Sequence, residues 1–256
     1  MGKNIIGLDI GGSKITGVVF DGKTVVKDLT IVTPKNLKDF KYSLLNLVKF
    51  LSVGKKISGL GVGCAGLINQ QQGIVVRSPN LKFLAHFSFK KFFHSVRFSR
   101  VEADNDANAF TRAELLLGQG KKYKHFLGVI LGTGMGGGIV IDSKIYRGAN
   151  HFGGEIGKFR LNKENHLEHD FQKFRDRNDY KNLGEIVGIA LSNAVHLLDP
   201  QAIILGGSVA INASSKFLPY AKHTLRKLLP KQRKLPVIVV SKLKHGGAMG
   251  AALLVI

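Results

Sequence analysis

Cysteine, acidic side chains and long apolar runs are scarce in this 256-residue sequence. Cys64 is the one cysteine, which excludes an intramolecular disulfide and any zinc site built from several thiolates. No apolar run reaches the ~18–20 residues that span a bilayer. Asp9 interrupts the first apolar run, which starts at Ile5, too early for the core of a signal peptide. We therefore expect a cytoplasmic protein with no membrane partner.

Acidic residues number 17 against 38 Lys and Arg, so the formal net charge is +21. Such a charge suits an anionic partner, such as nucleic acid, or a solvated basic surface. The lysines are spread along the chain, which favours the second interpretation. Residues 83–93 combine Phe and Lys, as an RNA-stacking surface would. Because Phe89, Phe92, Phe93 and Val96 share helical spacing, we predict core packing there and no specific nucleic-acid partner.

Hydrophobic periodicity predicts alternating strands and helices. A β-hairpin is expected over 4–10 and 15–20, and a loop with a short helix over 161–181. Further strands are expected at 57–62, 99–103, 126–131, 137–141, 202–205 and 236–240. Helices are expected at 40–51, 88–96, 106–117, 184–198, 218–229 and 246–252, with Pro219 in the first turn of its helix. The strand, glycine turn and strand of 126–141 repeat the opening pattern, which indicates a duplicated α/β unit.

Three glycine-rich turns, at 11–13, 132–138 and 206–208, each follow an apolar strand. Glycine lets backbone N–H groups approach an anion with no side chain in the way. One such turn is more often an ordinary tight turn, whereas three favour a nucleotide site. None is a P-loop, because the Lys-Ser/Thr ending is missing.

Three acidic residues stand at positions where they can act on a ligand. Asp9 ends the first strand, where it can support Mg²⁺ beside phosphates or cap the turn. Asp106 begins a helix after a strand, where an acid is aimed into a cleft or caps the helix. Glu155 lies between glycines and is equally well explained as a solvated loop acid.

The order of these segments resembles the ROK family of sugar kinases and sugar-responsive repressors. The resemblance, from residue 4 to the C-terminus, rests on Leu-Asp-Ile-Gly-Gly-Ser-Lys (8–14), Gly-Val-Gly-Cys-Ala-Gly (61–66), Ser-Pro-Asn-Leu (78–81), Asp-Asn-Asp-Ala-Asn-Ala (104–109), Leu-Gly-Thr-Gly-Met-Gly-Gly-Gly (131–138), Gly-Gly-Glu-Ile-Gly (153–157), Leu-Asp-Pro with Ile-Leu-Gly-Gly (198–207) and Gly-Ala-Met-Gly-Ala-Ala (247–252). It implies an actin-like ATPase (ribonuclease H-like) fold with two α/β domains around a central cleft. The expected N-terminal domain is 1–105, completed by 246–256, and the expected C-terminal domain is 106–245.

The resemblance also implies roles for individual residues. Asp106 corresponds to the general base that takes the proton of a sugar hydroxyl, and Asp9 to the residue that supports Mg²⁺, directly or through water. The implied sugar-binding positions are Asn105, Glu155, Glu168, Asn80, Gly66 and Lys158. The implied ATP-binding positions are Gly11, Gly12, Ser13, Lys14, Gly132, Thr133, Gly134, Gly206 and Gly207.

The reaction that the resemblance implies is ATP-dependent phosphorylation of a hexose, with glucose to glucose 6-phosphate first. A kinase for an N-acetylated hexosamine and a catalytically impaired sugar-binding relative are the alternatives. Repressors of the family carry an N-terminal helix-turn-helix, for which a strand starting at residue 4 leaves no room. Family members commonly dimerise, so a homodimer is an expected assembly.

The sequence departs from the family at its zinc site. Most relatives follow Gly-Glu-X-Gly with His and a cysteine-rich stretch that binds structural zinc. Here Lys158 stands at the His position and no cysteine follows, so we expect no zinc. The zinc loop and part of a helical subdomain are missing between Glu155 and residue 184. Lys158 then alters hydroxyl preference, contacts an anionic group or faces solvent.

Overall fold

The computed structural model describes residues 4–256, which form two compact units. The first unit runs to Leu116 and takes in Gly148–Phe152 and Leu243–Ile256. The second consists of Leu117–Arg147 and Gly153–Lys242. The units thus divide after Leu116, whereas the expected domains divide after residue 105, because the helix that starts at Asp106 packs within the first unit. The first three residues of the expected domain 1–105 lie outside the described part of the chain.

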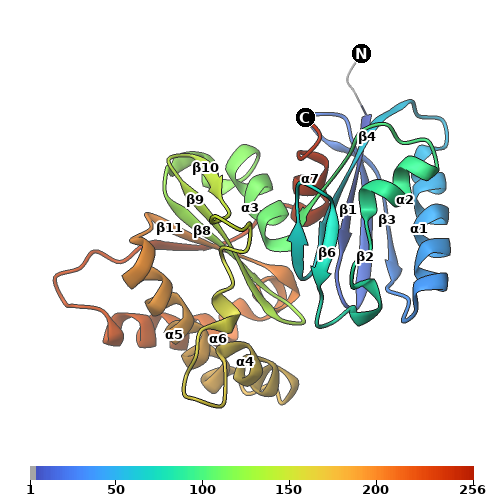
Figure 1. The fold of residues 1–256 in the computed structure, drawn as a ribbon. Helices are drawn as coiled ribbons and strands as arrows, with labels where there is room; N and C mark the ends of the chain where they lie inside the picture. The colour runs from blue at the N-terminus through green and yellow to red at the C-terminus, as the bar shows by residue number, and fades with distance from the viewer. Residues whose placement is uncertain (1–3) are drawn as a thin grey trace. The chain divides into compact units, whose positions relative to one another are not determined.

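The first unit contains a five-stranded sheet in the order β3-β2-β1-β4-β7 (Figure 1). Its strands are β1 (Asn4–Ile10), β2 (Lys14–Phe20), β3 (Val25–Val32), β4 (Ile57–Cys64) and β7 (Val101–Asn105). β1, β2 and β3 are antiparallel neighbours, whereas β4 runs parallel to both β1 and β7. A small hairpin of β5 (Leu67–Asn69) and β6 (Ile74–Arg77) follows β4. The carboxyl ends of β1, β4 and β7 therefore meet at one edge, where α/β sheets bind their ligands.

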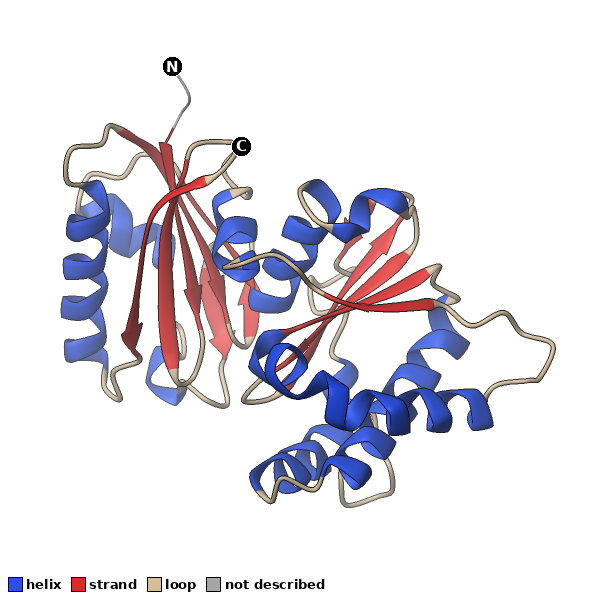
Figure 2. Ribbon diagram, turned by 180° about the vertical axis from the view of Figure 1, so that it is seen from behind, coloured by secondary structure: helices blue, strands red, loops and turns tan. Residues whose placement is uncertain are grey.

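Helices cover both faces of this sheet (Figure 2). They are α1 (Leu37–Ser52), α2 (Phe89–Ser95), α3 (Asp106–Leu116) and α7 (Gly246–Ala252). Side chains alternate along a strand, so Ile6, Leu8 and Ile10 enter a core with α1 and α2. Gly7 faces the opposite way, toward α7. Asp9 follows two residues later and therefore shares the α7 face.

The approach of α7 to the sheet is so close that only glycine fits. A Cβ on Gly7 would overlap the carbonyl oxygen of Ala248, and one on Gly61 would overlap that of Ala251. Gly7 and Gly61 are register partners on β1 and β4. On the far side of α7, Gly250 lies equally close to the carbonyl of Ala109 in α3. Backbone thus packs against backbone in the centre of this unit.

The second unit repeats the same sheet topology. Its order is β10-β9-β8-β11-β12, with β8, β9 and β10 antiparallel and β8, β11 and β12 parallel. The strands are β8 (Phe126–Leu131), β9 (Met135–Ile141), β10 (Lys144–Tyr146), β11 (Ala202–Gly206) and β12 (Val237–Val240). The α-helices are α4 (Leu167–Asp176), α5 (Tyr180–Leu198) and α6 (Gly207–Leu228). This repetition confirms the duplicated α/β unit.

Several predicted elements differ from those observed. β3, β5, β6 and β10 were not predicted, and α6 begins at Gly207 instead of near residue 218. Pro219 is therefore inside a helix and not in its first turn. The helix continues because its apolar stripe, from Ala210 to Leu225, stays buried on both sides of the proline. Pro219 and Ser215, whose carbonyl loses its helical donor, are both exposed to water.

The predicted phenylalanine core is confirmed in the first unit. Phe89 and Phe93 are fully buried, and Phe92 packs against the same core. Val96, which was expected beside them, is 38% exposed because α2 ends at Ser95.

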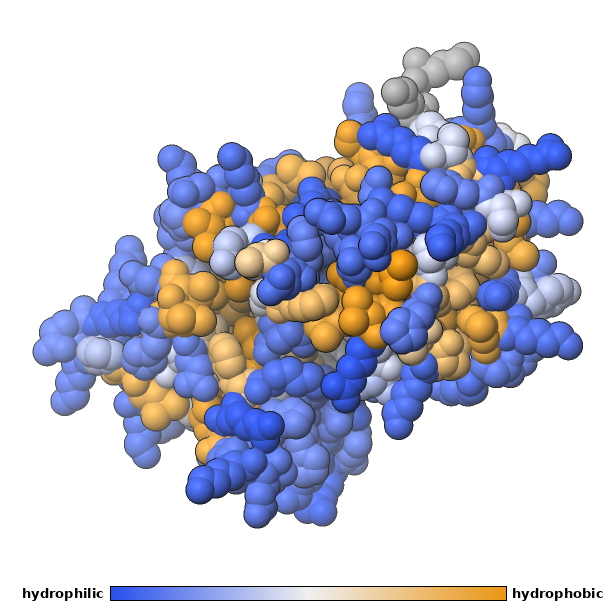
Figure 3. Space-filling view, in the orientation of Figure 1, coloured by the Kyte–Doolittle hydropathy of each residue, from blue (hydrophilic) through white to orange (hydrophobic). Residues whose placement is uncertain are grey.

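Hydrophilic residues are spread over both units on the face drawn in Figure 3. Between residues 4 and 256, we find no helix with the length and apolar character to span a bilayer.

Replacing Gly61 by Ala should destabilise the first unit by about 3 kcal/mol or more, because the added methyl meets the Ala251 carbonyl. Urea unfolding measures the change. Gly54→Ala is the matched control, since its methyl meets nothing within 4 Å and only its φ of +71° is unfavourable. That control should cost about 1–2 kcal/mol. Equal losses in the two variants would contradict the backbone contact.

Candidate active site

Two carboxylates lie at the carboxyl edge of the first sheet. Asp9 and Asp106 come from the end of β1 and the start of α3. Cys64, which pairs in register with Ile10 and Asn105, lies between these strands. Burial raises the pKa of the Cys64 thiol well above its usual value, and the negative charges of Asp106 and Asp9 raise it further. Both carboxylates are therefore near one buried sulfur.

Asn105 is fixed from two directions. Its Oδ1 accepts hydrogen bonds from the backbone N–H of Ala107 at 2.8 Å and of Asn108 at 3.3 Å, so it caps α3. Its Nδ2 donates to the carbonyl of Gly66 at 2.9 Å. The side chain thus joins α3 to the segment after β4.

Asp106 is held by the same junction. The buried Asp104 accepts from the Asn105 N–H at 2.8 Å and from Asn108 Nδ2 at 3.1 Å, which locks the turn before Asp106. Asp106 itself is partly buried, and its Oδ1 accepts from the Ala107 N–H at 3.0 Å. The sequence did not mark Asp104 as functional, although a fully buried acid needs such partners.

Asp9 occupies a poorly solvated position. Burial raises its pKa to about 6, and the nearby Lys14 ammonium only partly opposes this rise. A Cβ on Gly247 of α7 would lie 2.5 Å from Asp9 Oδ2, so the helix closes directly over the carboxylate. A buried acid with this raised pKa is stabilised in its ionised form by a cation, and oxygen ligands suit Mg²⁺. Asp9 therefore fits the expected metal-supporting role.

The turn from Gly11 to Ser13 is fastened at its base. The Gly11 N–H donates to the Lys14 carbonyl at 3.0 Å, and Thr33 Oγ1 donates to the Gly11 carbonyl at 2.8 Å. A Cβ on Gly12 would lie 2.9 Å from Cβ of Asn80. The structure thus brings Asn80 against this turn, and it adds Thr33, which the sequence did not suggest.

Gly66 lies where another residue would not fit. Its φ is +123°, and a Cβ would overlap the carbonyl of Arg77. Ser78 Oγ donates to the Ala65 carbonyl at 2.6 Å, which joins the two ends of the β5–β6 hairpin. Gly66 and the Ser78–Asn80 segment are consequently neighbours.

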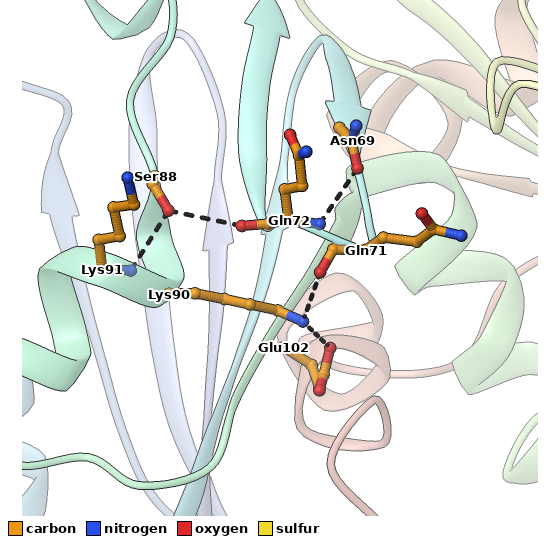
Figure 4. Close-up of polar contacts among 7 residues, drawn as sticks. All are labelled: Asn69, Gln71, Gln72, Ser88, Lys90, Lys91 and Glu102. Atoms are coloured by element: carbon orange, nitrogen blue, oxygen red, sulfur yellow. Dashed lines mark hydrogen bonds and ion pairs between the residues drawn. The ribbon is translucent and has the colours of Figure 1, made fainter.

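The tip of this hairpin is tied to the sheet through α2 (Figure 4). Lys90 Nζ donates to the Gln71 carbonyl at 3.1 Å and pairs with Glu102 Oε2 of β7 at 2.9 Å. Ser88 caps α2 by accepting from the Lys91 N–H at 3.2 Å. These contacts fasten the tip of the hairpin that follows Gly66 to α2 and β7.

In the second unit, two glycine segments meet beside β8. The Gly132 N–H donates to the Gly134 carbonyl at 3.0 Å, which closes the turn between β8 and β9. Gly207 has φ +86°, and a Cβ there would overlap the Leu131 carbonyl. Gly206 ends β11, which is parallel to β8, so both segments lie at the same sheet edge.

Lys158 and Glu168, expected as separate sugar contacts, form an ion pair with each other. Glu168 Oε1 also accepts from the Met135 N–H at 3.3 Å. A Cβ on Gly134 would overlap the same carboxylate oxygen. Glu168 therefore lies against the β8–β9 turn, and Lys158 neutralises part of its charge.

Glu155 follows a glycine that no other residue could replace without strain. Gly154 has φ +100°, and a Cβ there would overlap the Gly137 carbonyl of β9. Glu155 is partly buried and precedes a short 3₁₀ helix, Ile156–Lys158. The loop that carries Glu155 is thus packed against β9.

Sequence reasoning missed two residues at the β8–β9 turn. Arg175 donates to the carbonyls of Gly132, at 3.0 Å, and Thr133, and Gln172 Nε2 donates to the Thr133 carbonyl at 3.2 Å. The one available signal was the spacing of Glu168, Gln172 and Arg175, which places them on one helical face.

The predicted residues therefore form two groups, one within each unit. The first unit carries Asp9, Gly11, Gly12, Ser13, Lys14, Gly66, Asn80, Asn105 and Asp106. The second carries Gly132, Thr133, Gly134, Glu155, Lys158, Glu168, Gly206 and Gly207. Within residues 4–256, no three His, Cys, Asp or Glu side chains are grouped as metal ligands would be. The expected absence of zinc stays a prediction.

Comparison with known proteins identifies related sequences. The model of the ROK family matches residues 5–170 and 171–256. A glucokinase of Streptomyces coelicolor is 35% identical over 159 residues, which cover 61% of this chain and 49% of that protein. The chain thus aligns with about half the length of that relative. An N-acetyl-D-glucosamine kinase of Haemophilus influenzae is 30% identical over 309 aligned positions, which cover 97% of this chain and 98% of the kinase.

Solved structures give the fold. A ROK family glucokinase from Streptomyces griseus, in complex with glucose and AMPPNP, has a TM-score of 0.89 at 22% identity, covering 98% of this chain and 99% of that one. A ROK hexokinase from Thermus thermophilus has a TM-score of 0.80 at 26% identity, covering 98% and 97%. The expected actin-like ATPase fold is confirmed.

The alignment of 309 positions exceeds the 256 residues of the chain, so the Haemophilus kinase carries segments that are missing here.

Asp9→Asn should stabilise the ligand-free protein above pH 6. The raised pKa means that burying ionised Asp9 opposes folding at high pH, and this penalty disappears as pH falls from about 6 toward the unfolded value of 3.8. Urea unfolding of variant and wild type at pH 8 and pH 4 measures the difference, which should shrink on acidification.

Asp21→Asn is the control of opposite sign. Backbone hydrogen bonds from Thr24 and Lys23 lower the pKa of exposed Asp21, so its contribution is present at neutral pH and is lost on acidification. A pH-independent effect of Asp9→Asn would contradict the buried-charge interpretation.

Proposed function

The chain belongs to the ROK family, and from this premise we propose that it transfers the γ-phosphoryl group of ATP to a hydroxyl of a hexose, with Asp106 as the general base. The observation that carries the proposal is the junction of β7 and α3, where Asp106 is held beside Asn105 and, like Asp9, lies near the buried Cys64. Glucose is the proposed first substrate. The similarity to glucokinases supports it.

In this proposal, Asp106 accepts the proton from the attacking hydroxyl. Phosphoryl transfer through a loose transition state needs positioning and charge neutralisation more than a strong base. Asp106 therefore mainly orients the hydroxyl, and the bonds that fix its junction serve that purpose. Asn105, held by Gly66 and α3, lines the sugar beside it.

The glycine turns serve the nucleotide phosphates. Backbone N–H groups in the turns at Gly11–Ser13 and Gly132–Gly134 are the proposed donors, and Gly206–Gly207 lies toward the adenosine. Asp9 would hold Mg²⁺, which neutralises phosphate charge when bound. The raised pKa of Asp9 supports this role, because a bound cation offsets the cost of its buried charge.

Glu168 and Glu155 are the proposed sugar acceptors of the second unit. A carboxylate offers about four lone-pair sites. Glu168 uses some of them for Lys158 and Met135 and retains acceptor capacity for a hydroxyl. The ion pair also fixes its orientation, which limits the hydroxyl arrangements that it can accept.

Phosphorylation of an N-acetylated hexosamine is the second candidate. The N-acetyl-D-glucosamine kinase of Haemophilus influenzae aligns along nearly the whole chain, whereas the Streptomyces coelicolor glucokinase aligns along 61% of it. A catalytically impaired sugar-binding protein is the third, because Lys158 replaces a family histidine.

Asp106→Asn should retain sugar binding and lower turnover about 10²–10⁴-fold, the usual contribution of a general base. Calorimetric sugar binding and a coupled ATP-turnover assay measure the two quantities. Glu102→Gln, on the strand that precedes Asp106 and paired with Lys90, is the control and should keep turnover. Near-normal turnover of Asp106→Asn would remove Asp106 from the base role.

A panel of hexoses tests the substrate. We expect kcat/KM for glucose to exceed that for N-acetylglucosamine about ten-fold or more, because an acetamido group needs room and partners that a site for a plain hydroxyl lacks. The reverse order would reassign the protein as a hexosamine kinase. Folded protein that binds sugar and turns over none would contradict the kinase proposal and favour the impaired relative.

A further inference from the structure

One face of α4 grips the β8–β9 turn. Arg175 donates to the carbonyls of Gly132, at 3.0 Å, and Thr133, and Gln172 donates to Thr133 at 3.2 Å. On α4, Glu168 lies one helical turn before Gln172 and two before Arg175. Glu168 accepts a hydrogen bond from the Met135 N–H, just after the β8–β9 turn. The helix therefore holds carbonyl groups at the start of the turn and an N–H group at its end.

These bonds control where the N–H groups of the turn point. Each planar trans peptide places the carbonyl of one residue opposite the N–H of the next. Holding the carbonyls of Gly132 and Thr133 toward α4 therefore directs the N–H groups of Thr133 and Gly134 away from it. Glycine at 134 is also required, because a Cβ there would overlap Glu168.

The Arg175 side chain is held in place by Asp176. Its Nε donates to Asp176 Oδ1 at 2.8 Å, and its second terminal nitrogen lies 2.6 Å from the same oxygen. The side chain is 24% exposed, so water competes little for the guanidinium. One terminal nitrogen, Nη1, donates to both carbonyls, while Nε and Nη2 face Asp176. The planar guanidinium thus divides its donors between the turn and Asp176, which a lysine ammonium does less well.

We propose that Arg175 is a positioning residue for the nucleotide phosphates. It holds the Gly132–Gly134 turn so that its N–H groups face the β- and γ-phosphates, and its positive charge adds to the attraction of that turn. This inference rests on the proposed kinase function, and it assigns a role to a residue of α4 that the sequence did not mark.

Arg175→Ala should weaken binding of a non-hydrolysable ATP analogue about ten-fold, the loss expected for charge-assisted hydrogen bonds. Binding of AMP should change less than about two-fold, since AMP lacks the phosphates that the turn meets. Calorimetry measures both affinities. If Arg175 had a merely structural role, Arg175→Ala would lower the affinities for the ATP analogue and for AMP by the same factor. The ratio of the two affinities is therefore the decisive quantity.

Arg177→Ala is the matched control. It removes the same charge, from an exposed residue at the end of the same helix. Its ATP-analogue affinity should stay within about two-fold of wild type. Arg175→Lys, which keeps the charge, should recover part of the lost affinity. If Arg175→Ala does not fold, the ratio of ATP-analogue to AMP affinity is measured with Arg175→Lys and Gln172→Ala instead.

Equal losses for the ATP analogue and AMP, or equal effects of Arg175→Ala and Arg177→Ala, would overturn the proposal. So would wild-type protein that binds neither nucleotide. Wild type that binds the ATP analogue but phosphorylates no sugar would contradict the kinase function alone, because the two affinities still report on Arg175.

Discussion

The close contact of α7 with the first sheet is the constraint on which the first unit depends. Gly7, Gly61 and Gly250 let the backbone of the last helix pass within van der Waals distance of two strands and of α3. The same approach brings Gly247 onto the carboxylate of Asp9. Packing and electrostatics are thus linked, because the helix that completes the core also removes water from Asp9 and raises its pKa.

Local patterns were sufficient for most of the fold. Glycine turns that follow apolar strands identified β1, β8 and β11, and the apolar runs after the first two turns identified β2 and β9. Repetition of the strand, turn and strand indicated two similar sheets. β3 was missed because its residues alternate between partly buried and exposed, and it contains no continuous apolar run. The start of α6 was missed because Gly206–Gly207 looked like a turn, and only packing of the stripe around Phe217 shows that the helix begins there.

Some site residues were also recognisable from the local sequence, whereas the roles of others depend on contacts between distant parts of the chain. Asp106 and Asn105 were recognisable because a strand-to-helix junction and a family motif coincide at one place in the sequence. The bonds of Arg175 to Gly132 and Thr133 join residues more than forty positions apart, and no local pattern encodes them. The Lys158–Glu168 ion pair is similar, since each residue had a separate expected role and only the fold reveals that they neutralise each other.

Several of the acidic residues lie among the candidate site residues, whereas the surplus basic residues are dispersed. The chain has 17 acids, a scarce residue type. Asp9, Asp104 and Asp106 lie among the candidate site residues of the first unit, and Glu155 and Glu168 lie among those of the second. The lysines are dispersed, and a net charge of +21 attracts a polyanion at long range. Screening limits that attraction to about 8 Å at physiological salt. In the proposed function, discrimination of one phosphate ligand from another would therefore come from short contacts at the glycine turns, where Arg175 holds the carbonyls of Gly132 and Thr133.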